Sequence, residues 1–167
     1  MKKTDLKRLT TLSLSVSVAM ILSYIESLIP VFIPIPGVKL GLSNIATVFT
    51  LYTLGAPAAA AVSLLRVLLS ALLFGNAMSL IFSLSGALLS LGFMIILKRT
   101  QLFSAIGVSS GGAVAHNAGQ IIAAVFVMEN AGIASYLAPL ILSGTLAGVV
   151  IGVAAGILTQ KTAPFIR

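Results

Sequence analysis

Arg66 is the most informative ionisable residue, because it stands between two long uncharged stretches of the sequence. Ser63 and Ser70 lie three residues before it and four after it, so a helix carries all three on one face. A guanidinium group donates hydrogen bonds as a planar fork that fits a carboxylate or a phosphate. The pattern indicates an anion-binding group. An ion pair with Glu26 is the structural alternative, and the two roles are compatible if a ligand competes for the arginine.

A second polar cluster consists of His116, Asn117 and Gln120. His116 and Gln120 are one helical turn apart and share a face, so the cluster is interpreted as the wall of a binding pocket. The alternative is hydrogen bonding between helices, at about 0.6 kcal/mol per contact. Asn44 and Asn76 are further candidate ligand contacts, and either is equally suited to cap a helix.

No catalytic constellation is evident. The acids are Asp5, Glu26 and Glu129, far apart in sequence, so no carboxylate pair is expected to hold Mg²⁺. There is no cysteine, no second histidine for a metal site, and no phosphate-binding loop. We therefore expect neither an enzyme nor a cofactor or metal, and ATP hydrolysis by this chain is excluded.

The elements that position these residues must be membrane helices. Of 167 residues 59% are apolar and 8% are charged, against about a quarter charged in soluble domains. Uncharged stretches cover residues 9–25, 40–65, 67–97, 100–128 and 130–160. A span takes about 20 helical residues, and the apolar runs are too continuous for barrel strands. The sequence predicts an all-α integral membrane protein in a single domain, 1–167, with about six transmembrane helices.

The expected helices are 10–29, 43–54, 58–74, 77–97, 111–128 and 135–158. A Gly/Ser segment at 107–112 is expected to break the chain before the fifth helix. The segment from Pro30 to Gly37 is apolar but carries three prolines, so it cannot be helical. It is interpreted as a plug over an outward-facing pocket or as an interfacial loop.

The net charge of +7 indicates topology rather than nucleic-acid binding. With six spans and the N-terminus inside, the basic residues outside the spans fall on the cytoplasmic side, except Lys39 in an outer loop. The residues on the cytoplasmic side are Lys2, Lys3, Lys7, Arg8, Lys98, Arg99, Lys161 and Arg167. Both termini are therefore expected in the cytoplasm, and the first helix is expected to be retained rather than cleaved as a signal peptide.

Small residues recur at four-residue spacing, which lets membrane helices approach closely. One stripe is Gly144, Gly148, Gly152 and Gly156, and another is Ser15, Ala19 and Ser23. Packing within the chain's own bundle is the simpler interpretation. Docking of a partner protein, or self-assembly into a pore, is the alternative.

Four segments resemble a known family: 35–46 (IPGVKLGLSNIA), 66–70 (RVLLS), 75–79 (GNAMS) and 112–120 (GAVAHNAGQ). Together they resemble the bacterial "Gx transporter" family, also called heptaprenyl diphosphate synthase component I, over nearly the whole chain. That family in turn resembles the substrate-binding S components of energy-coupling factor (ECF) transporters. These are six-helix proteins that capture micronutrients and work with a transmembrane scaffold subunit and ATPase subunits.

The resemblance implies a multi-pass protein of the bacterial cell membrane with an outward-facing site capped by the loop after the first helix. In this interpretation the candidate substrate contacts are Lys39, Asn44, Arg66, Asn76, His116, Asn117 and Gln120. Ser15, Ala19 and Ser23 would contact the scaffold, with serines where the family pattern has alanines. The bundle would topple in the membrane to carry a small anionic or amphipathic substrate, of prenyl, quinone or flavin type.

The synthase label implies a different role. A prenyl diphosphate synthase needs aspartate-rich motifs, and the sequence has none. The alternative function is therefore a non-catalytic accessory subunit, associated with prenyl diphosphate or quinone synthesis or with extracellular electron transfer.

Overall fold

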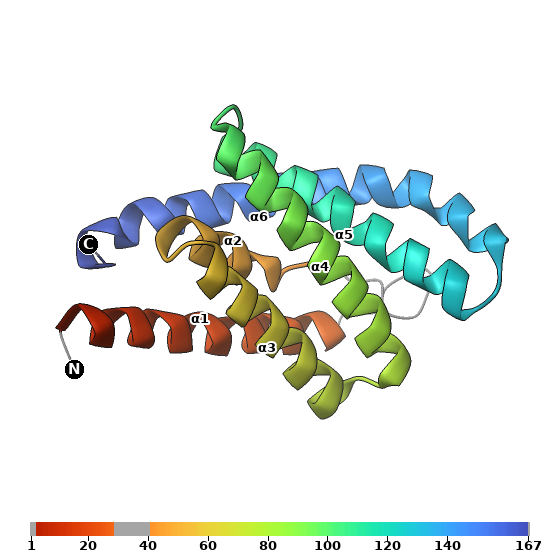
Figure 1. The fold of residues 1–167 in the computed structure, drawn as a ribbon, viewed down its shortest axis with the longest axis horizontal. Coiled ribbons are helices and arrows are strands. Elements are labelled where there is room, and N and C mark those ends of the chain that lie inside the picture. Colours follow the sequence, from red (N-terminus) through yellow and green to blue (C-terminus); the bar gives the residue numbers. More distant parts are fainter. Residues whose placement is uncertain (1–2, 29–40, 167) are drawn as a thin grey trace.

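The computed structural model describes residues 3–28 and 41–166, and this part of the chain is helical without strands (Figure 1). The elements are α1 (Lys3–Leu28), α2 (Asn44–Thr53), α3 (Ala56–Phe74), α4 (Ala77–Thr100), α5 (Ala105–Val127), the short 3₁₀ helix η1 (Ala131–Tyr136) and α6 (Leu137–Ile166). The predicted all-α class is confirmed, with six α-helices near the expected positions.

Four of the described segments are long and apolar enough to cross a membrane: Asp5–Leu28 in α1, all of α3, all of α4, and Ala131–Phe165 in η1 and α6. The 23-residue α5 is also long enough, but it carries several glycines and serines with one histidine, one asparagine and one glutamine, and it is not among these four segments. The 10-residue α2 is about 15 Å long and cannot cross about 30 Å of hydrocarbon. The molecule is a helical membrane bundle with one short internal helix.

The helices form two groups, one of α1, α2 and α3 and the other of α4, α5 and α6. The groups meet where α2 packs on α6 and where α3 packs on α4. α5 packs along both α4 and α6, while α1, α2 and α3 pack on one another, and α3 also packs on α4. α2 lies between α1 and α6, and the start of α1 and the end of α6 lie at the same end of the bundle (Figure 1).

Five of the basic residues lie at the same end of the bundle. Lys98 Nζ donates a 2.5 Å hydrogen bond to the carbonyl of Leu51 in the last turn of α2 and lies 4.8 Å from the centre of the Tyr52 ring. Arg8 lines a neighbouring pocket with Leu54 of the α2–α3 turn. We call this region the basic end; its residues are Lys7, Arg8, Lys98, Arg99 and Lys161.

The predicted break at 107–112 is wrong, because these residues lie inside α5. The helix begins after Ser104, whose Oγ accepts from the N–H of Gly107. A Cβ on Gly111 would lie 2.6 Å from Leu97 Cδ1, and one on Gly112 would collide with Met94. The glycines therefore let α5 pack closely on α4, which outweighs their helix cost of about 1 kcal/mol each.

The glycine stripe of α6 faces α5. A Cβ on Gly148 would lie 2.5 Å from Ser110 Cα, and one on Gly152 would lie 2.6 Å from Ile106 Cα. Close backbone approach within the chain's own bundle is confirmed for this stripe. It is occupied by α5 in the structure and offers no surface for a pore between copies.

Candidate functional site

Arg66 lies in the middle of α3 and is buried, with 7% of its surface exposed. Its Nη1 donates a 2.8 Å hydrogen bond to Oγ of Ser43, the residue that precedes α2. Its Nε and Nη2 are buried without a hydrogen-bond partner in the described part of the chain. Nε–H and Nη2–H point from the same edge of the guanidinium, the edge that grips a carboxylate or phosphate with two parallel hydrogen bonds.

Glu26 supplies the negative charge that acts on Arg66. It lies near the end of α1 and is 2% exposed, and its Oε1 accepts a hydrogen bond from the N–H of Gly41. The two side chains that the sequence proposed as an ion pair therefore interact electrostatically. Among the described residues, however, the hydrogen bond of the guanidinium goes to Ser43.

A layer of small apolar residues lies one helical turn away from Arg66. Ala19, Ala46 and Val62, from α1, α2 and α3, pack together and are 0 to 3% exposed. One helical turn further along, α1 places Ser23 and α3 places Arg66. The small residues bring three backbones close enough for polar side chains from all three helices to meet.

Sequence reasoning missed Ser43, which contacts Arg66, and the buried Thr47, which lies one helical turn after Ser43. Ser43 and Thr47 are 0% and 1% exposed, and the Thr47 hydroxyl is buried without a hydrogen-bond partner among the described residues. Ser43, Thr47 and Thr50 are spaced i, i+4, i+7 and are all buried. A polar face on a short helix flanked by apolar sequence was the signal that could have found them.

A small cavity of about 10 Å³ adjoins Arg66 on its other side. It is lined by Arg66, Val67, Ser70 and Ala71 of α3 and by Ser79 and Ser83 of α4. A water molecule needs about this much room, so this cavity is too small for a substrate. Ser70 and Arg66 share it, as their spacing predicted.

The second predicted cluster is divided between two helix interfaces. Asn117 Nδ2 donates a 2.7 Å hydrogen bond to the carbonyl of Leu140, which joins α5 to α6. His116 and Gln120 lie against α4, where a Cβ on Gly86 would meet the His116 carbonyl at 2.8 Å and Gln120 Cγ at 2.9 Å. For Asn117 the structure shows the alternative, an interhelical hydrogen bond.

The remaining predicted contacts have different positions. Asn76 caps α4: its Oδ1 accepts from the N–H of Ser79 at 2.8 Å, and its side chain is exposed. Asn44 is the first residue of α2 and follows Ser43 directly, so it lies beside the arginine site. Lys39 and the predicted plug lie outside the described residues.

The predicted partner stripe on α1 is inside the bundle. Ser15, Ala19 and Ser23 are 4%, 0% and 1% exposed, so the structure uses them for packing within the chain. A scaffold contact through these residues stays a prediction, and it requires α1 to move away from its neighbours.

The fold and the site define a polytopic α-helical membrane protein with an arginine-centred polar cluster buried between three helices. The family model described as heptaprenyl diphosphate synthase component I matches residues 15–158. The chain belongs to this family, as its resemblance indicated. Comparisons with curated proteins and with solved structures gave no significant match.

Proposed function

We propose that this chain is the substrate-binding membrane subunit, or S component, of an ECF-type uptake transporter. Its substrate is a small anionic or amphipathic molecule. The observation that carries the proposal is the edge of Arg66 formed by Nε and Nη2, which is buried without a hydrogen-bond partner among the described residues. A buried donor pair of this kind costs free energy unless an acceptor meets it.

The surroundings of Arg66 favour an anionic group on the ligand. Ser43, which contacts Arg66, is the residue before the amino end of α2. The helix dipole places partial positive charge at that end. Glu26 offsets part of the positive charge of Arg66, so an anionic ligand would compete with this carboxylate. A carboxylate or phosphate on the substrate would accept both hydrogen bonds from the open edge.

The energy for transport comes from partner proteins in this proposal. The sequence contains no phosphate-binding loop, so ATP hydrolysis belongs to separate ATPase subunits, joined through a membrane scaffold subunit. The complex lies in the bacterial cell membrane, and the chain itself is not an enzyme.

A second function is favoured by the family's description as component I of a heptaprenyl diphosphate synthase. In this alternative the chain is a non-catalytic membrane subunit that assists a prenyl-transferring enzyme. It shares the expected preference for an anionic amphiphile, but it predicts a different partner.

Native mass spectrometry of the protein released gently from its own membranes tests the proposal. We expect a retained small molecule that bears a carboxylate or phosphate, together with scaffold and ATPase subunits. Arg66→Gln should lose the small molecule, whereas Arg99→Gln, an equal charge change at an exposed position, should keep it.

Arg66→Lys separates a binding role from a structural role, because it keeps the charge but loses the two-donor edge. A folded lysine variant without the small molecule supports the proposal. Equal retention by wild type and both Arg66 variants contradicts it, and co-purification with a prenyl-transferring enzyme instead of ATPase subunits establishes the alternative.

A further inference from the structure

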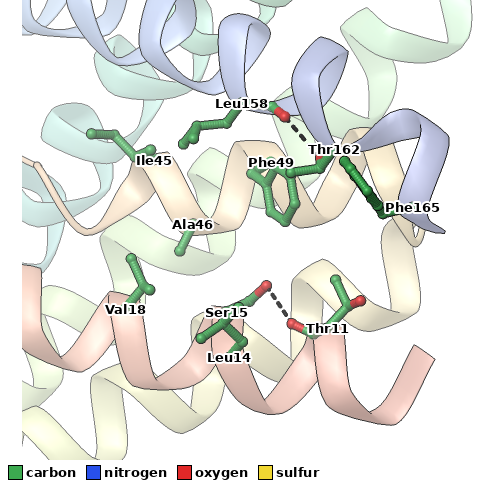
Figure 2. Close-up of a pocket in the computed structure, with 10 residues that line it drawn as sticks. All are labelled: Thr11, Leu14, Ser15, Val18, Ile45, Ala46, Phe49, Leu158, Thr162 and Phe165. Carbon is green, nitrogen blue, oxygen red and sulfur yellow. Dashed lines mark hydrogen bonds between the residues drawn. The ribbon is translucent and has the colours of Figure 1, made fainter. Parts of the chain in front are cut away.

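A groove separate from the arginine site runs between α1 and α6, with α2 as its floor (Figure 2). Its volume is about 290 Å³. It is lined by Thr11, Leu14, Ser15 and Val18 of α1, Ile45, Ala46 and Phe49 of α2, and Leu158, Thr162 and Phe165 of α6. In Figure 2 the α1 residues lie along the bottom, the α2 residues cross the middle, and the α6 residues run from the top to the right side.

Seven of the ten residues that line the groove have apolar side chains. Its three hydroxyl groups each donate to a carbonyl of their own helix: Thr11 to Lys7 at 2.9 Å, Ser15 to Thr11 at 2.8 Å, and Thr162 to Leu158 at 2.8 Å. These side chains therefore have no hydroxyl hydrogen left for a ligand. A hydrocarbon chain is an occupant that requires no hydrogen-bond donor from the wall.

An extended hydrocarbon chain is narrower than a helix and can lie along the groove between α1 and α6.

Two lysines of the basic end lie beside the groove in the sequence of its helices. Lys7 lies one turn before Thr11, and Lys161 lies three residues after Leu158, so both share a helical face with groove residues. Both lysines are exposed. They are placed to meet a phosphate whose hydrocarbon chain enters between the helices, because basic residues between or beside membrane helices attract anionic headgroups.

We propose that this groove is a binding site for an anionic phospholipid, with one acyl chain against α2 and the phosphate between Lys7 and Lys161. The lipid fills the space between α1 and α6 in the half of the bundle that carries the start of α1 and the end of α6. This site is independent of the proposed transport substrate and of Arg66.

Native mass spectrometry tests the site with purified protein equilibrated in equal amounts of phosphatidylglycerol and phosphatidylcholine of matched chains. We expect one retained phospholipid, with phosphatidylglycerol preferred. Val18→Trp fills the groove and should lose the lipid. Ile21→Trp is the control, since Ile21 is 58% exposed on the same helix and does not line the groove.

Two double variants that remove charge test the headgroup contact, and this test does not depend on how Val18→Trp folds. The double variant Lys7→Gln/Lys161→Gln should lower the preference for phosphatidylglycerol by about fivefold for each lysine removed. Arg8→Gln/Arg99→Gln removes the same charge from the basic end outside the groove and should leave the preference unchanged.

Equal lipid retention by the two tryptophan variants, or equal loss of preference in the two charge variants, overturns the proposal. Retention of a polyprenyl phosphate, a partner protein or a second copy of this chain in place of the phospholipid also overturns it.

Discussion

The guanidinium of Arg66 donates its hydrogen bond to Ser43 across 2.8 Å, which joins the middle of α3 to the start of α2. The Ser43 hydroxyl makes no capping hydrogen bond to α2. It fixes the arginine so that the opposite edge, Nε and Nη2, stays unpartnered among the described residues.

Ser43→Ala should destabilise the protein by about 1.5 kcal/mol, because it leaves the third nitrogen of the buried guanidinium without an acceptor as well. Thermal unfolding in detergent measures the effect. Ser17→Ala is the control, since Ser17 is exposed on α1 and bonds only to its own helix. Equal unfolding temperatures for the two variants would show that the hydrogen bond contributes nothing.

Glu26 and Arg66 should behave as a coupled pair. Glu26→Gln or Arg66→Gln alone leaves one buried charge without its counter-charge, whereas the double variant removes both charges. We expect the double variant to be more stable than the sum of the single changes predicts, by about 1 to 3 kcal/mol. A double-mutant cycle of unfolding free energies measures this coupling, and strict additivity would mean that the two charges act separately.

Asn117→Ala should lower the unfolding free energy by about 0.6 kcal/mol, the average for a hydrogen bond between membrane helices. The side chain bonds to the Leu140 carbonyl, so the small molecule retained through Arg66 should still be present in the native mass spectrum. Loss of that molecule with unchanged stability would return Asn117 to the binding site.

Gly148→Ala should destabilise the α5–α6 contact by about 1 to 3 kcal/mol. The added Cβ would lie 2.5 Å from Ser110 Cα, a backbone atom that cannot turn away. Gly156→Ala adds the same methyl group to the same stripe, but its nearest neighbour is 4.0 Å away, so this variant should be neutral or stabilised. Similar unfolding temperatures for both variants would contradict the close packing of these helices.

The sequence predicted the class of the protein and most of its helices, because membrane insertion depends on long apolar runs that are visible without a fold. The sequence also pointed to Arg66 and Glu26 as candidate functional residues, since a charge inside a membrane-spanning run is costly and rarely accidental. The start of α5 was predicted wrongly because glycines that normally break a helix are required there for contact with α4.

Only the tertiary structure decided which polar residues share a site. Periodicity placed Ser70 on the face of Arg66, but it could not show that Ser43, 23 residues away, accepts the hydrogen bond of the guanidinium. Likewise, His116 and Asn117 are neighbours in sequence yet contact α4 and α6 respectively. A helix turns by about 100° at each residue, so adjacent side chains point to different neighbours, and only the packing of the whole bundle determines which helix each one meets.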